Sequence, residues 1–153
     1  MKKKSGSCQC GNLKYEIDGE NLGLGICYCT ECQKLSSGIA TYSLVIKRSS
    51  FKLLSGTLKQ WERSSDNGNR NIGNFCPECG NRIYHENPET PDIIRVKAGK
   101  LEDGSKLEPD MHIWLRSAPS WVKVPEGAMA YQTQPSVEKI VKYINELRAK
   151  KQS

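Results

Sequence analysis

The chain has 153 residues, of which 37% are apolar and 26% are charged, and its mean hydropathy is -0.62. A chain of this size forms one compact domain by default, and no apolar run approaches the roughly 20 residues of a membrane-spanning helix. The formal net charge of +6 lies at the two ends, because residues 5–135 carry equal numbers of basic and acidic side chains. Solubilising ends are therefore a simpler interpretation than the basic face of a nucleic-acid-binding domain.

The segments between the cysteines are typical of short β-strands joined by turns. Residues 13–17 alternate apolar and charged side chains, which predicts a strand that ends at a turn. Residues 41–46 are rich in β-forming side chains, and residues 51–61 predict a hairpin with its turn at the glycine. Residues 64–74 are polar and predict either a loop or a long hairpin tip. Residues 93–96 predict a further strand.

A single segment near the C-terminus has a clear helical pattern. Ser136 is a suitable N-cap, and apolar residues follow it at helical spacing. This stripe is expected to pack on the domain, and a helix that binds a partner is the alternative. The stripe consists of Val137, Ile140, Val141, Ile144 and Leu147.

Seven cysteines are the most informative feature of the composition. The odd number argues against a disulfide framework, and the basic start of the chain is not followed by the apolar stretch of a secretory signal. We therefore expect a cytoplasmic, reducing location, where closely spaced thiols are more often metal ligands. The cysteines form three groups, which are Cys8 and Cys10, then Cys27, Cys29 and Cys32, and finally Cys76 and Cys79.

The two cysteine pairs have the spacing of structural zinc ligands. A Zn–S bond near 2.3 Å places tetrahedral sulfurs about 3.8 Å apart, a separation that two cysteines can reach around a tight turn. Gly11 and Gly80 trail the pairs and can adopt the positive φ that such turns need. Two pairs complete one closed site, and two buried, metal-free cysteine pairs are the alternative. The closed site would be formed by Cys8, Cys10, Cys76 and Cys79.

The remaining trio has the ligand number of a catalytic zinc site. Three protein ligands leave a fourth position for water or substrate, whereas structural sites are saturated. Two alternatives stay open from spacing alone. His85 or His112 could complete a second structural site, or the three thiols could hold no metal.

Longer motifs around these cysteines resemble a known family. They are residues 6–16 (Gly-Ser-Cys-Gln-Cys-Gly-Asn-Leu-Lys-Tyr-Glu), 27–34 (Cys-Tyr-Cys-Thr-Glu-Cys-Gln-Lys) and 75–80 (Phe-Cys-Pro-Glu-Cys-Gly). Together they resemble the glutathione-dependent formaldehyde-activating enzyme family, which shares a domain with centromere protein V. Residues 112–114 and 118–131 are also similar to segments of that family.

The resemblance implies a mostly β, Mss4-like sheet domain clipped by zinc. Together with the basic start of the chain and the helical pattern near its end, it predicts a basic arm at residues 1–5, the zinc domain at 6–133 and one C-terminal amphipathic α-helix at 134–153. It also implies two Zn²⁺ per chain. The structural ion would be held by Cys8, Cys10, Cys76 and Cys79, and the catalytic ion by Cys27, Cys29 and Cys32.

The implied activity is that of a carbon–sulfur lyase, which reversibly adds glutathione or a similar thiol to formaldehyde or another small aldehyde. The expected partners are these small molecules, with neither a membrane nor a nucleic acid. His112 is a candidate for proton transfer and equally a candidate for a packed structural residue. Lys34 and Arg116 are candidate anchors for substrate carboxylates. The alternative function is a non-enzymatic zinc module that binds protein or nucleic acid. The basic ends of the chain favour this alternative, whereas the absence of net charge on residues 5–135 argues against it.

Overall fold

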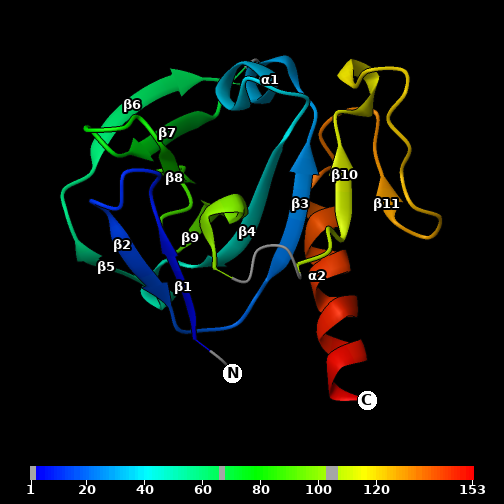
Figure 1. Cartoon of the computed structure of the whole chain (residues 1–153). Helices are drawn as coiled ribbons and strands as arrows, with labels where there is room; N and C mark the ends of the chain where they lie inside the picture. The colour runs from blue at the N-terminus through cyan, green and yellow to red at the C-terminus, as the bar shows by residue number, and fades with distance from the viewer. Residues whose placement is uncertain (1–2, 66–67, 103–106) are drawn as a thin grey trace. The chain divides into compact units, whose positions relative to one another are not determined.

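The computed structural model describes residues 3–65, 68–102 and 107–153 (Figure 1). Its elements are mostly β-strands, and a long helix occupies the C-terminal residues, so the prediction of a mostly β fold with a C-terminal helix is confirmed. The residues group into two compact units. Unit 1 comprises residues 1–24 and 43–108, and unit 2 comprises residues 25–42 and 109–153.

Unit 1 contains two antiparallel arrangements of strands. One is a sheet in the order β1-β2-β5, formed by β1 (Lys4–Ser7), β2 (Lys14–Ile17) and β5 (Phe51–Ser55). The other runs in the order β4-β9-β8-β7-β6, formed by β4 (Thr41–Lys47), β9 (Ile93–Lys97), β8 (Arg82–Glu86), β7 (Arg70–Phe75) and β6 (Lys59–Ser64). Short 3-10 turns lie at η1 (Arg48–Ser50) and η2 (Ala98–Lys100).

Aromatic packing fills the core of unit 1. The rings of Tyr15 and Phe51 stack with centroids 5.2 Å apart, and Phe51 contacts the ring of Tyr84 at 5.0 Å. Leu13 and Ile17 are fully buried on the same alternating face as Tyr15, as the sequence pattern predicts. This burial explains why residues 13–17 form a strand.

One predicted strand pairing is wrong. Residues 51–61 do contain strands on both sides of Gly56, but β5 pairs with β2 and β6 pairs with β7. The reason is packing, because the pairing with β2 places Phe51 opposite Ile17 and Leu53 opposite Tyr15. The polar segment at residues 64–74 lies at the tip of the β6–β7 hairpin, and its second half, residues 70–74, belongs to β7. Residues 66–67 lie outside the described residues.

Gly56 allows the chain to leave β5 without a clash. Its φ is +83°, and a Cβ added there would lie 2.4 Å from Leu13 Cδ2 and 2.8 Å from the carbonyl oxygen of Asn12. Gly127 has a nearly equal φ of +84° with nothing within 4 Å of such a Cβ. Alanine substitutions at the two glycines therefore separate the free-energy cost of the left-handed backbone from the free-energy cost of steric crowding.

Gly56→Ala is expected to lower the free energy of unfolding by about 3 kcal/mol, the sum of left-handed strain and overpacking against Leu13. Gly127→Ala is the matched control and should cost only about 1 kcal/mol, because it adds the strain alone. Denaturant unfolding followed by circular dichroism measures both. Equal losses for the two variants would contradict the crowding at Gly56.

Unit 2 is built on parallel strands. The order is β11-β10-β3, with both pairings parallel, and the strands are β3 (Gly23–Cys27), β10 (Met111–Ile113) and β11 (Met129–Ala130). Helix α1 (Thr30–Ser36) follows β3, and the 3-10 turn η4 (Leu115–Ser117) follows β10. Because parallel neighbours end at the same edge of a sheet, the segments after these strands lie side by side (Figure 1). We call this side of unit 2 the carboxyl edge.

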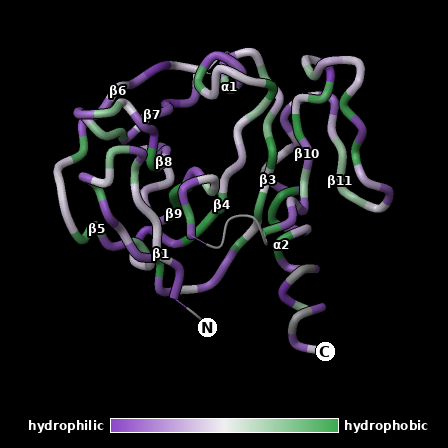
Figure 2. Tube along the Cα trace, viewed as in Figure 1, coloured by the Kyte–Doolittle hydropathy of each residue, from purple (hydrophilic) through white to green (hydrophobic). Residues whose placement is uncertain are grey.

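The C-terminal helix α2 (Val137–Gln152) begins where the sequence predicts. The hydroxyl of Ser136 accepts a hydrogen bond from the backbone N–H of Lys139, as an N-cap does. Hydropathy alternates along the helix between apolar and strongly hydrophilic residues (Figure 2). Ile140 and Ile144 are half-buried, whereas Val141 is 49% exposed, so the predicted apolar stripe packs only in part.

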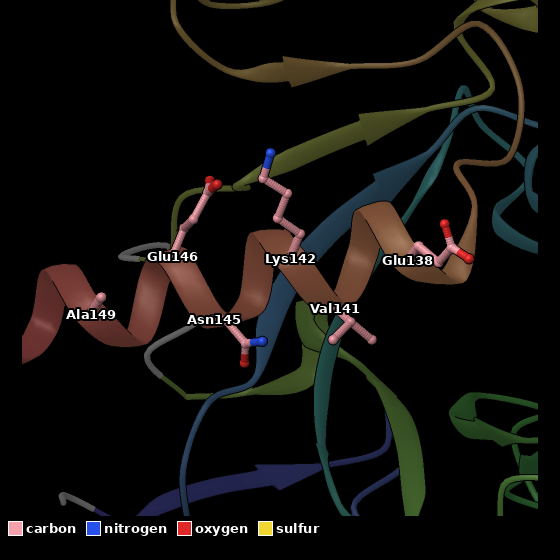
Figure 3. A pocket seen from close by; sticks show the side chains of 6 residues that line it. All are labelled: Glu138, Val141, Lys142, Asn145, Glu146 and Ala149. Atoms are coloured by element: carbon pink, nitrogen blue, oxygen red, sulfur yellow. The ribbon is translucent and has the colours of Figure 1, made fainter.

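A shallow hollow runs along the exposed side of α2. Lys142 and Glu146 point to one side of it, and Val141 and Asn145 point to the other (Figure 3). It contains none of the cysteines. Among the described residues, no helix is long and apolar enough to cross a membrane.

Candidate metal centres

Four cysteines of unit 1 meet in one cluster. The Sγ atoms of Cys8, Cys10, Cys76 and Cys79 all lie within 4.8 Å of one another. The Sγ–Sγ distances are 3.5 Å between Cys8 and Cys10 and 3.8 Å between Cys10 and Cys76. These values match the edge of about 3.8 Å in a tetrahedral zinc–thiolate site. The donor set therefore fits a closed four-thiolate metal site, the type that zinc favours.

Each pair sits on a tight turn that is closed by the N–H of the glycine following the second cysteine. The N–H of Gly11 donates to the carbonyl of Cys8 at 3.0 Å, and the N–H of Gly80 donates to the carbonyl of Cys76 at 2.8 Å. Both glycines have positive φ, +79° and +75°, as the trailing glycines predict. A hydrogen bond of 2.8 Å from the N–H of Gln9 to Asn81 Oδ1 joins the two turns directly.

Backbone N–H groups face the sulfurs of this cluster. The N–H of Leu13 donates to Cys8 Sγ at 3.2 Å. Hydrogen bonds from the N–H groups of Cys10 and Asn81 lower the pKa of Cys79 to about 6. Such bonds stabilise the thiolate form, which is the form that binds metal.

The other three cysteines meet at the carboxyl edge of unit 2. The Sγ atoms of Cys27, Cys29 and Cys32 lie within 4.8 Å of one another, and all three residues are half-buried. Cys27 ends strand β3, Cys29 caps helix α1, and Cys32 lies in its first turn. In the described part of the chain, no histidine, aspartate or glutamate joins this cluster. The donor set is therefore three thiolates, which fits the ligand number of an open tetrahedral site.

Neighbouring groups orient two of these sulfurs. The N–H of Cys32 donates to Cys29 Sγ at 3.3 Å, and Thr41 Oγ1 donates to Cys32 Sγ at 3.1 Å. Hydrogen bonds to Cys29 and Cys32, followed by burial, hold the pKa of Cys27 far above its usual range. Three thiols so close together therefore need a compensating cation to ionise together, and a divalent metal would supply that charge.

Gln33 fastens the trio to the segment after β10. Its Nε2 donates to the carbonyl oxygens of Tyr28 at 2.8 Å and of Ser117 at 2.7 Å. The N–H of Tyr28 also donates to the carbonyl of Ile113 at 3.1 Å. These bonds hold the turn that carries the three cysteines against η4.

His112 is buried beside the trio and is not part of it. Its ring is stacked on that of Tyr28, and its Nδ1 lies 3.0 Å from the Tyr28 hydroxyl. Burial lowers the pKa of His112, so the ring is neutral near pH 7. Tyr28 lies between Cys27 and Cys29, so its contact with His112 links the loop that carries these cysteines directly to β10.

His85 lies elsewhere, on β8 of unit 1. It is 6% exposed, and its Nε2 lies 2.9 Å from Arg82 Nη1. Burial, together with the nearby cations Lys97 and Arg82, holds its pKa well below the usual range. His85 is therefore a neutral, structurally bonded ring that belongs to neither cysteine cluster.

Three residues that support the trio were not predicted, namely Tyr28, Gln33 and Thr41. Tyr28 and Gln33 lie next to the cysteines in the sequence, and this proximity is the signal that could have identified them. Thr41 lies nine positions beyond Cys32 and carries no motif. Its hydrogen bond to Cys32 depends on the start of β4 lying against α1 within unit 2.

Comparison with known proteins identifies a family and a similar solved structure. The family model described as glutathione-dependent formaldehyde-activating enzyme matches residues 3–117. Among solved structures, the chain is similar to the crystal structure of a Rhodobacter sphaeroides protein, with a TM-score of 0.51 and 16% identity. That match covers 83% of this chain and 98% of the other, and at this identity it concerns the fold alone. No curated protein matches the chain significantly.

Proposed function

The chain belongs to the glutathione-dependent formaldehyde-activating enzyme family, and we propose that it reversibly joins a thiol to formaldehyde or another small aldehyde. In this reaction the thiol sulfur bonds to the carbonyl carbon, and the thiol proton ends on the oxygen as a hydroxymethyl thioether forms. The reverse reaction is a carbon–sulfur cleavage. Glutathione is the thiol that the family description names.

The observation that carries this proposal is the presence of two cysteine clusters with different ligand numbers. The cluster of four would hold a structural zinc ion. Cys27, Cys29 and Cys32 would hold a second ion with one position left for exchange. When bound there, zinc supplies Lewis acidity, which lowers the pKa of a thiol and keeps it nucleophilic near neutral pH.

The protein's own residues prepare this position. Thr41 and the backbone N–H of Cys32 orient sulfurs of the trio through the hydrogen bonds described above. Gln33 keeps the loop closed against Ser117. Such outer contacts fix the directions of the ligands and raise the affinity for metal.

His112 enters the proposal through Tyr28. Because its Nδ1 faces the tyrosine hydroxyl and the residue is 6% exposed, it is suited to positioning the loop between Cys27 and Cys29. Direct proton transfer by His112 stays a prediction. A pH profile of turnover for His112→Gln and for Tyr28→Phe would separate the two roles. If His112 transfers a proton, its loss removes one ionisation from the profile. If His112 only positions the loop, both variants lower turnover and keep the shape of the profile.

Purified protein should contain close to two zinc ions per chain, held by the four-thiolate and three-thiolate clusters. Titration with a chelator should remove them in two steps. The ion of the trio should leave first, because an exchangeable ligand lowers the barrier to its release. Zinc analysis by plasma mass spectrometry during the titration measures this order, and a single ion per chain after zinc-replete purification would exclude the two-site arrangement.

The function itself is tested by formaldehyde consumption in the presence of glutathione. The protein should accelerate formation of the hydroxymethyl adduct, measured by exchange NMR, and removal of the first zinc ion should abolish the acceleration. Refilling with zinc should restore it. An adduct rate that equals the uncatalysed rate for the fully zinc-loaded protein would refute the proposed function.

A further inference from the structure

Within unit 1, one face of the sheet formed by β4, β9, β8, β7 and β6 is strongly basic. The strand register places Trp61, Gly73, His85 and Arg95 in one row across four neighbouring strands. Successive side chains of a strand point to opposite faces, so positions two residues away share the face of this row. None of the described strand positions on this face is acidic. We call it the basic face, and its cations are Lys47, Lys59, Arg63, Arg82, Arg95 and Lys97.

The acidic residues of these strands lie on the opposite face. In the neighbouring row of the register, Glu62 is opposite Ile72, and Ile72 is opposite Glu86. Glu62 forms an ion pair with Arg70, and Glu86 forms one with Arg48. The balanced charge of residues 5–135 therefore conceals a separation of charge between the two faces of one sheet.

The cations of the basic face gather around the buried ring of His85. Arg82 Nη1 lies 2.9 Å from His85 Nε2, and Arg95 Nη2 donates to Asn71 Oδ1 at 3.4 Å. These bonds orient two guanidinium groups against a neutral ring and a neutral amide, so they do not cancel the charge. Burial, followed by the charges of four cations, holds the pKa of His85 below its usual range. The four cations are Lys97, Arg82, Arg95 and Arg63.

An exposed aromatic ring lies among these cations. The guanidinium carbon of Arg82 lies 5.9 Å from the ring centroid of Trp61 and 5.8 Å from that of Phe75. Gly73 makes room for it, because a Cβ added there would lie 2.2 Å from Arg82 Nη1. Trp61 is nevertheless 53% exposed. The cation therefore steadies the indole while much of the ring faces solvent.

The arrangement discriminates between classes of anionic partner. Ile93 is the other large apolar side chain exposed on the basic face, and it lies on β9, three strand spacings or about 14 Å from β6. Two apolar side chains so far apart form no patch that could enter a membrane. An acidic polypeptide would pair with the cations and make no use of the indole. Single-stranded nucleic acid uses both, because its phosphates attract cations and its bases stack on aromatic rings.

We propose that the basic face binds single-stranded nucleic acid, with one base stacked on Trp61 and the flanking phosphates held by the surrounding cations. Arg63 lies two residues from Trp61 along β6, about 7 Å away, so it is placed to meet a phosphate next to the stacked base. This function is separate from the thiol–aldehyde reaction. The basic face belongs to unit 1 and the three-cysteine cluster to unit 2, and neither proposal depends on the other.

Fluorescence anisotropy with a labelled oligothymidylate of about 15 nucleotides measures binding to the zinc-loaded full-length protein. Trp61→Ala should weaken binding about tenfold, the loss expected for one stacked base. Arg63→Gln should weaken it about fivefold, as for one exposed charge contact. Arg70→Gln is the matched control, since it removes a cation from the same hairpin on the opposite face, and it should bind as the wild type does. Circular dichroism checks that each variant is folded.

Salt dependence and an altered strand separate stacking from charge. Each lost phosphate contact reduces the slope of log K against log salt by about 0.7 for single strands, so Arg63→Gln should lower the slope and Trp61→Ala should keep it. An abasic strand of the same length should bind the wild type about tenfold more weakly than oligothymidylate. This comparison uses the wild type alone and holds even if a variant fails to fold.

Three results would overturn the inference. One is the absence of wild-type binding at roughly 0.1 M salt. Another is an equal Kd for the wild type, Trp61→Ala and Arg63→Gln, which would assign the binding to the basic ends of the chain. The third is equal or tighter binding of polyglutamate or of phosphatidylserine vesicles, which would assign the face to an acidic polypeptide or to a membrane surface.

Discussion

Cys79→Ser should yield a chain that does not fold. Cys79 belongs to a closed cluster in which Cys10 and Cys76 are 66 positions apart, so a metal ion held there ties the start of unit 1 to its middle. Structural zinc in small domains contributes about 10 to 16 kcal/mol of binding free energy, which exceeds the 5 to 15 kcal/mol that typically separates the folded from the unfolded state. Serine is a poor zinc ligand, and most of that contribution would be lost.

The measurement is circular dichroism with thermal unfolding and zinc analysis on the same preparation. Glu78→Gln is the matched control, since it alters an exposed residue of the same turn and leaves all four sulfurs in place. It should fold with a Tm close to that of the wild type. A folded Cys79→Ser protein with wild-type Tm would show that the four-cysteine cluster does not carry the stability assigned to it.

Cys29→Ser should have the opposite effect, with the fold retained and the activity lost. The trio spans only residues 27–32, so an ion held there clips a local turn instead of joining distant segments. Cys29 is also the N-cap of α1, where its sulfur accepts from the N–H of Cys32 at 3.3 Å. Serine is among the best N-cap residues and can replace this contact, while it cannot replace the thiolate as a ligand.

The variant should therefore retain the wild-type circular dichroism spectrum and hold about one zinc ion per chain. Its thiol-dependent aldehyde turnover should fall by more than roughly 100-fold, the upper range seen when only an outer contact of a metal site is removed. Glu31→Gln alters a half-buried residue of the same helix and leaves all three sulfurs in place, so it should keep both zinc ions and turnover. If Cys29→Ser unfolds as completely as Cys79→Ser, both clusters are structural and the proposed function loses its main support.

The grouping of the cysteines into two clusters was predictable because it depends on local spacing. Two cysteines separated by a short turn can reach one metal ion whatever the rest of the fold does, and a trailing glycine supplies the positive φ. The division into Cys8, Cys10, Cys76 and Cys79 against the trio followed from ligand counting and agrees with the clusters observed. The start of α2 at Ser136 was predictable for the same reason, since an N-cap acts within one turn.

Pairings between distant residues were harder to predict. The strands on either side of Gly56 look like a hairpin in the sequence, but burial of Phe51 against Tyr15 draws β5 to β2. Helix α1 was missed because its seven residues contain none that is buried, which leaves no apolar stripe to detect. Short parallel strands such as β10 carry equally little periodic signal.

By itself the sequence determined which residues could bind metal and how many ligands each group offers, because those properties reside in side-chain chemistry and in turns of a few residues. Only the tertiary structure decided which residues surround the two cysteine clusters. Parallel pairing of β10 with β3 brought the ring of His112 against that of Tyr28, 84 positions away in the chain. Strand registers of this kind depend on which apolar faces can be buried together, and local spacing does not encode that choice.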